Sequence, residues 1–145
     1  MSDLHVLCKI GDVEYVLSTD DVVQMESFVG ATKVPGARAE VAGLVQIRGR
    51  VVPVLDMRVV FGLPAVAPTI DSRVLVMKHA ERTVGLLVDS AREVLRIPAE
   101  NFQPPPPVVS RQTEGLVKAV VQVRDRLLML IDSTKVISEE DEHGP

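Results

Sequence analysis

The most informative stretch of this 145-residue chain reads Gln46-Ile47-Arg48-Gly49-Arg50-Val51-Val52-Pro53-Val54-Leu55-Asp56. The aliphatic residues on either side of the Arg-Gly-Arg triplet predict two strands, 41–47 and 51–55, joined by a tight connection. Pro53 has no N–H to donate to a neighbouring strand, so it predicts a sheet edge or a bulge. Two arginines beside such an edge fit a docking surface for carboxylates and a solvated hairpin tip equally well.

The residues that follow this stretch predict a short capped helix. Asp56 is a favourable N-cap for a helix over 57–61, and Gly62 and Pro64 are residues that end helices. Beyond them, the Pro-containing segment 65–72 is the expected boundary between two lobes.

The rest of the chain is predicted to form mainly short strands. Apolar alternation predicts a hairpin of residues 4–10 and 13–17 around Gly11-Asp12. Similar patterns predict hairpins of 73–77 with 83–88 and of 116–123 with 127–131. Three segments are less regular: 20–26 fits a helical turn or a third strand, 91–97 a strand or a short helix, and 133–137 a closing helical turn. The prolines at 104–107 predict an exposed, extended segment.

Composition favours an all-β protein with an aliphatic core. Hydrophobic residues make up 46% of the chain and aromatic residues only 3%, so the core must consist mostly of Val, Leu and Ile. Many short strands with turn residues between them predict a barrel or a sandwich. The net charge of −4 is matched by the acidic residues of the segment 139–145, which is expected to be a flexible tail, and this balance gives no support for nucleic-acid binding.

The cellular location is predicted from the single cysteine and the hydropathy. Cys8 lies on the apolar face of an alternating run, which indicates a buried structural thiol in a reducing compartment. The chain has neither a basic and apolar leader nor an apolar run of the roughly 20 residues that span a bilayer. We therefore expect a cytoplasmic protein that is not inserted in a membrane.

Three apolar runs end in aspartate, at Asp56, Asp89 and Asp132, which hints at a duplicated unit. The sequences after Asp89 and Asp132 are loosely similar to the Asp-Thr/Ser-Gly signature of aspartic proteases, but both lack its glycine. Caps of turns are the favoured interpretation, and a carboxylate-dependent hydrolase is the remote alternative. The three histidines are too far apart in sequence for a metal motif: we expect His5 on the polar face of its strand, His79 in a hairpin turn and His143 in the tail. No phosphate-binding loop is present, so we expect no catalytic residues, metal or cofactor.

The stretch around Arg48 resembles the signature of the CheW family of chemotaxis coupling proteins, in which an Arg-Gly pair precedes an apolar-Pro-apolar-apolar-Asp run. Further family landmarks occur in order at Val41-Ala42-Gly43-Leu44, Gly85-Leu86-Leu87-Val88-Asp89, Gly115-Leu116 and Leu128-Met129-Leu130-Ile131-Asp132. The resemblance covers residues 4–137. It implies a single domain over 1–138 made of two five-stranded, SH3-like barrels on a shared aliphatic core, with the C-terminal strands possibly returning to the first lobe.

The resemblance also implies a function and its residues. Family members bridge the cytoplasmic tip of a chemoreceptor and the regulatory domain of a histidine kinase, so the chain is expected to be a non-enzymatic scaffold, monomeric alone and recruited to receptor arrays at the membrane. The implied receptor-binding residues are Val22, Gln24, Met25, Gly43, Arg48, Gly49 and Val51. The implied kinase-binding residues are Arg73, Val74, Phe102 and Gln103.

Gln24 departs from the family pattern, because many members have glutamate there. Glutamine keeps the hydrogen-bonding capacity but loses the charge. The alternative function is therefore a divergent adaptor that lacks one of the two contacts or serves a non-flagellar pathway.

Overall fold

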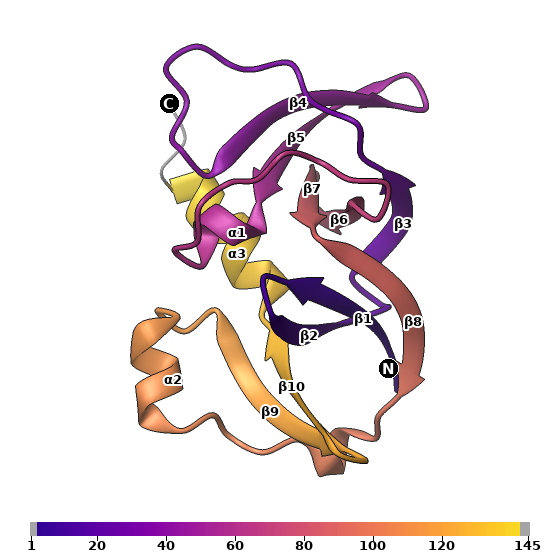
Figure 1. The fold of residues 1–145 in the computed structure, drawn as a ribbon, viewed down its shortest axis with the longest axis vertical. Helices are drawn as coiled ribbons and strands as arrows, with labels where there is room; N and C mark the ends of the chain where they lie inside the picture. Colours follow the sequence, from indigo (N-terminus) through magenta and orange to yellow (C-terminus); the bar gives the residue numbers. More distant parts are fainter. Residues whose placement is uncertain (1–2, 143–145) are drawn as a thin grey trace.

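The computed structural model describes residues 3–142, with side chains for residues 3–138. Its strands form two five-stranded sheets, which confirms the all-β prediction. Sheet one has the order β8 (Ser90–Arg96), β1 (Leu4–Ile10), β2 (Val13–Ser18), β10 (Arg126–Ile131) and β9 (Val117–Val123). Sheet two has the order β3 (Val22–Ser27), β6 (Arg73–His79), β7 (Arg82–Val88), β5 (Arg50–Asp56) and β4 (Val41–Ile47). In Figure 1 sheet two fills the upper half of the molecule and sheet one the lower half.

The two halves of the chain are topological repeats of each other. When β1 to β5 are exchanged in order with β6 to β10, the strand order of one sheet becomes that of the other. Each sheet also contains one parallel pair, β2 with β10 and β5 with β7. Each half therefore contributes strands to both sheets. Asp56 is the last residue of β5, and Asp132 directly follows the equivalent strand β10. Each caps a helix by accepting a backbone N–H, from Arg58 at 3.0 Å and from Lys135 at 3.0 Å.

The connections between strands show where the chain passes from one sheet to the other. The segment 65–72 connects β5 to β6, and both strands belong to sheet two. The chain crosses between sheets instead at residues 19–21, after β2, and at Asp89, after β7. The C-terminal strands β9 and β10 lie in sheet one with β1 and β2.

Short helices connect the strands. They are α1 (Met57–Val60), the 3-10 turn η1 (Ala99–Asn101), α2 (Pro107–Gln112) and α3 (Ser133–Glu142). Helix α2 was not predicted: Pro106 is extended, but Pro107 occupies the first helical position, where its missing N–H costs nothing. Helix α3 continues to Glu142, so the backbone of 139–142 is helical, and residues 143–145 of the expected tail lie outside the described residues.

One apolar core joins the two sheets, as the resemblance implied. It contains Val6 and Leu17 from sheet one, Leu75 and Leu86 from sheet two, and the α1 residue Met57. Helices α1 and α3 lie at the junction of the sheets (Figure 1), and Val136 and Ile137 of α3 belong to the same core. Each sheet also encloses a small core of its own, centred on Val16 and Leu128 in sheet one and on Val54 and Val76 in sheet two.

A single bridge draws together the two edges of each sheet. In sheet two the chain after β3 returns to β4, where Thr32 and Leu44 exchange backbone hydrogen bonds of 2.9 and 2.8 Å. In sheet one the chain after β8 returns to β9, where Gln103 and Val120 exchange two bonds of 2.9 Å. Leu44 and Val120 are both the fourth residue of a seven-residue strand, so the two bridges are equivalent.

Two predictions about single residues were wrong. Pro53 lies in β5, an interior strand, and not at a sheet edge; the register shift in its hairpin lies on β4, between Val41 and Gly43. Its missing N–H is tolerated because pairing of β5 with β7 begins only at Val54. His5 is buried, not on a polar face: its Nδ1 lies 2.9 Å from the Asp3 carbonyl oxygen and its ring packs on Phe102.

Candidate protein-binding surfaces

The predicted receptor-binding residues all lie in sheet two or in its β4–β5 turn, and none of them lines the cavity between the two edges of this sheet. Val22, Gln24 and Met25 belong to edge strand β3, and Gly43 belongs to the other edge strand, β4. The cavity between these edges, which we call the seam cavity, has a volume of about 510 Å³. Its walls are residues 26–32, which form the end of β3 and the chain after it, residues 44–47 of β4, and Val74 of β6.

The β4–β5 turn presents the two arginines to solvent. Arg48 and Gly49 have φ values of 51° and 78°, the left-handed conformation that a two-residue hairpin requires. Arg48, Gly49 and Arg50 are exposed, and Val51 beside them is 67% exposed. Because Ile47 lines the seam cavity, this basic and apolar tip is continuous with its rim.

Gly43 is buried and has a structural role. Its φ is +143°, and a Cβ at this position would overlap the carbonyl oxygen of Thr32. Only glycine allows the chain at Thr32 to approach β4 closely enough to form the bridge with Leu44. Gly43 therefore allows the Thr32–Leu44 bridge to form, and because it is buried it is not itself available to a partner.

The side chain of Gln24 lies beside a carboxylate, that of Glu26. Its Nε2 donates to Glu26 Oε2, on the same face of β3 two residues further on. The face that lacks a charge at position 24 thus carries one at position 26. Val23 and Met25 on the opposite face are 59% and 42% exposed, which leaves apolar surface on this edge strand.

The predicted kinase-binding residues fall in two separate places. Arg73 and Val74 lie in β6 of sheet two, where Arg73 Nη1 donates to the carbonyl oxygens of Ile70 and Ser72 at 2.8 Å each. Val74 is only 2% exposed and can be reached only as part of the seam cavity wall. Phe102 and Gln103 lie at the equivalent seam of sheet one, where Gln103 is exposed and Phe102 is half-buried.

The strand-end aspartates serve structural partners. Asp89 Oδ2 accepts from the Gly11 N–H at 2.6 Å and from Arg58 Nη1 at 2.7 Å, which ties α1 to the β1–β2 turn. Burial raises the pKa of Asp56, with its backbone bonds to Arg58 and Val59 acting against the rise. Asp132 caps α3, so Asp89 and Asp132 have separate partners and separate roles.

Other potentially reactive groups are buried or scattered. Burial raises the pKa of the Cys8 thiol to about 12, which makes it a poor nucleophile, as predicted. Across residues 3–142 no group of His, Cys, Asp and Glu side chains could hold a metal ion, and His143 lies outside that range. None of the described helices has the length and apolarity of a transmembrane span.

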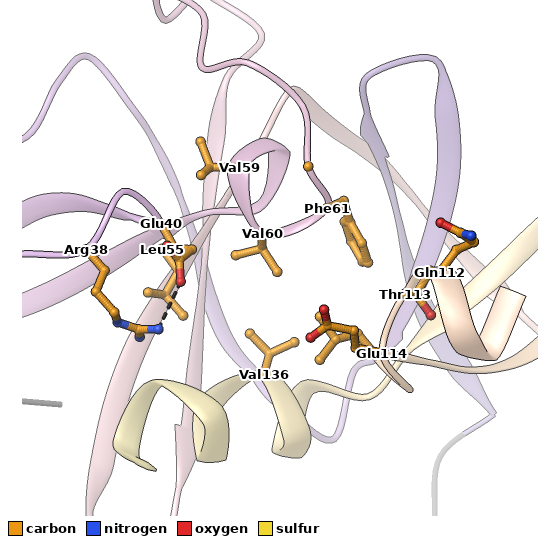
Figure 2. Close-up of a pocket in the computed structure, with 12 residues that line it drawn as sticks. Arg38, Glu40, Leu55, Val59, Val60, Phe61, Gln112, Thr113, Glu114 and Val136 are labelled. Atoms are coloured by element: carbon orange, nitrogen blue, oxygen red, sulfur yellow. Dashed lines mark hydrogen bonds and ion pairs between the residues drawn. The ribbon is translucent and has the colours of Figure 1, made fainter. Parts of the chain in front are cut away.

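A second cavity, of about 350 Å³, lies at the junction of the sheets (Figure 2). Its apolar wall includes Phe61, Leu116 and Val136, and its rim carries the ion pair of Arg38 with Glu40 at 2.9 Å. No predicted contact residue lines this cavity.

The chain consists of two five-stranded β-sheets that share an apolar core, and it exposes apolar side chains at the β3 edge and beside the β4–β5 turn. The family model of the CheW-like domain matches residues 4–141. The chain belongs to the CheW-like domain family, and it is a non-enzymatic scaffold of the chemotaxis type.

Individual relatives agree with this assignment. The chain is 28% identical over 135 residues to the chemotaxis protein CheW of Bacillus subtilis (strain 168), covering 93% of this chain and 86% of the relative. It is 29% identical over 133 residues to the chemotaxis protein CheW of Rhizobium meliloti (strain 1021), covering 92% and 86%. The crystal structure of the scaffolding protein TtCheW from Thermoanaerobacter tengcongensis superposes with a TM-score of 0.82 at 27% identity, covering 91% of this chain and 90% of that one.

Proposed function

We propose that this chain links the cytoplasmic tip of a chemoreceptor to the regulatory domain of a CheA-type histidine kinase. The observation that carries the proposal is the separation of two exposed surfaces on different sheets. One is the β3 edge with the Arg48 turn of sheet two, and the other is the seam of sheet one at Gln103. A coupler needs two surfaces that partners can occupy at the same time.

The mechanism is simultaneous binding without chemistry by this chain. On sheet two, Arg48 offers a planar, permanently charged group for a carboxylate, Val51 offers apolar area in the strand after this turn, and Met25 offers apolar area on β3. A receptor docked there and a kinase docked on Phe102 and Gln103 or on Arg73 would be held in a fixed relation by the shared core. A change in receptor packing would then reach the kinase as a change in relative orientation.

The proposal includes where the protein works. It is a cytoplasmic protein, monomeric by itself, that receptors recruit to arrays at the membrane. The family assignment supports this location, and the neutral balance of charges before residue 139 favours binding to proteins over binding to nucleic acid.

A specific observation favours a second candidate, a divergent adaptor with one altered contact. Gln24 replaces a residue that is often acidic in the family, and its side chain is bound to Glu26. Such an adaptor would bind the kinase normally and the receptor weakly.

Charge reversal at the hairpin tip tests the leading proposal. Arg48→Glu should abolish pull-down of a receptor tip fragment, while thermal unfolding stays nearly unchanged. Arg124→Glu is a matched control, because Arg124 has a similar φ of 58° and is exposed in the equivalent turn of sheet one. Equal loss of receptor binding in both variants, or normal binding by Arg48→Glu, would refute the receptor contact at this turn.

A further inference from the structure

The two sheets differ at the seams, by which we mean the bridges Thr32–Leu44 in sheet two and Gln103–Val120 in sheet one with the residues around them. Ala31 directly precedes the bridging residue Thr32 in sheet two, and Phe102 directly precedes the bridging residue Gln103 in sheet one. In both seams the bridging residue is exposed and the residue before it is partly buried, so Ala31 and Phe102 point inward. The two residues therefore occupy equivalent places on the small cores of their sheets.

Phe102 fills its seam, whereas Ala31 leaves its seam open. The Phe102 ring packs on the small core of sheet one, and its centroid lies 5.2 Å from that of His5. Ala31 packs on the small core of sheet two with only a methyl group, and the seam cavity opens beside it. The apolar wall that a ring would cover includes Phe28, Ile47 and Val74.

The backbone at the cavity also lacks a partner. Leu44 exchanges both of its hydrogen bonds with Thr32, so the N–H and C=O of Gln46, two residues further along β4, point toward the same side. Within residues 3–142 the Thr32–Leu44 bridge is the only backbone pairing along this edge of β4. The chain opposite bows outward, with Gly30 at a φ of +142° and Val29 92% exposed.

The charge at the rim specifies the occupant further. Arg48 and Arg50 follow Ile47 at one end of the cavity, and within the described residues neither has a carboxylate partner. A partner that lies along β4 would therefore gain from an acidic residue at that end.

We propose that the seam cavity is a docking site for an extended protein segment that carries a large apolar side chain and a neighbouring acidic residue. The apolar side chain takes the place beside Ala31 that Phe102 fills in the other sheet. The segment's backbone pairs with Gln46, and its acidic residue lies against the Arg48 turn, a mode of recognition in which an added strand supplies affinity and a side-chain pocket supplies specificity. This inference deepens the proposed function. It rests on that function only for the identity of the partner protein that supplies the segment.

The first test uses the chain alone with indole as an aromatic probe. Indole should shift the amide NMR signals of Val45, Gln46 and Ile47 in the wild type. Ala31→Phe should fill the cavity from within, raise the midpoint of thermal unfolding and remove these shifts. Ala39→Phe is the matched control, since it adds the same ring to an exposed site outside the cavity and should leave the shifts intact. Absence of shifts in the wild type would overturn the proposal.

The second test uses fragments of a receptor tip and of a kinase regulatory domain. Ala31→Phe should weaken binding of one of them by about tenfold or more, while Ala39→Phe binds like the wild type. Ala31→Leu serves the same purpose if the larger ring prevents folding. Unchanged binding of both fragments by a folded Ala31 variant would overturn this inference and leave the proposed function standing. A wild-type chain that binds neither fragment would instead refute the proposed function, and the indole test would still decide the inference.

Discussion

The guanidinium group of Arg58 lies 2.7 Å from the carboxylate of Asp89, and this ion pair connects α1 to the crossing between the two sheets. The same carboxylate oxygen accepts the Gly11 N–H from the first hairpin of sheet one. Arg58 also donates through Nε to the carbonyl oxygen of Pro64 at 2.9 Å. This carboxylate thus links α1 and the first hairpin of sheet one to the residue at which the chain crosses between the sheets.

Removal of this carboxylate should destabilise the chain. The side chains of Arg58 and Asp89 are 19% and 28% exposed, so solvent screens the pair only partly. We expect Asp89→Ala to lower the free energy of unfolding by about 2 kcal/mol, because it also leaves the Gly11 N–H without its acceptor. Urea unfolding measures this loss.

The control for this prediction is an exposed ion pair. Arg92 and Asp71 are 68% and 46% exposed, so Asp71→Ala should change the free energy of unfolding by less than about 0.5 kcal/mol. Similar losses in both variants would show that the Asp89 ion pair has no special structural role.

The seam bridge depends on glycine at position 43. Gly43→Ala should cost about 2 kcal/mol or more, because the new Cβ would combine a strained φ with overlap of the Thr32 carbonyl oxygen. Amide hydrogen exchange at Thr32 and Leu44 should accelerate in the same variant. Gly36→Ala is the control: its φ is +77° but its surroundings are open, so its cost should be about 1 kcal/mol and should leave the seam protected.

The buried carboxyl of Asp56 should influence how stability depends on pH. Burial raises its pKa above the ordinary value of 3.8, so the native state holds the proton more tightly than the unfolded state. Its contribution to stability is therefore complete below pH 3.8 and is lost as pH rises through the raised native value. Asp56→Asn keeps the cap to Arg58 and should abolish this component.

The measurement is the difference in unfolding free energy between wild type and Asp56→Asn across that pH range. The wild type should lose stability relative to the variant as pH rises. A difference that does not vary with pH would contradict the raised pKa of Asp56.

The Cys8 thiol should be unreactive in the folded protein. It is 2% exposed, and its pKa of about 12 leaves almost no thiolate near neutral pH. Labelling with a disulfide reagent such as dithionitrobenzoate at pH 8 should be slow in buffer and fast in concentrated urea. Rapid labelling of the native protein would show that β1 opens readily, contrary to its place in the shared core.

Local structure was largely predictable from the sequence, whereas the assignment of strands to sheets was not. The hairpins at Gly11-Asp12 and Arg48-Gly49 and the cap at Asp56 follow from turn and capping residues, whose effects are local. The parallel pairs β2–β10 and β5–β7 join segments far apart in the chain, and no local pattern indicates them. Pro53 was therefore misplaced at an edge, because the strand beside it comes from the other half of the chain.

The candidate surfaces were predictable only in part. Exposed turn residues such as Arg48 follow from the hairpin pattern, but the burial of Gly43 and Val74 depends on the approach of Thr32 and on the pairing of β6. The seam cavity depends on the difference between Ala31 and Phe102, which becomes meaningful only when the repeat is seen in three dimensions.

Sedimentation velocity of a three-component mixture shows whether both partners bind this chain at the same time. The mixture contains this chain, a receptor tip fragment and a kinase regulatory domain, with each pair measured separately. We expect a ternary complex that sediments faster than either binary complex, and we expect Arg48→Glu to leave only the complex of chain and kinase. Displacement of the receptor fragment by the kinase domain, with only binary complexes at saturation, would contradict simultaneous binding.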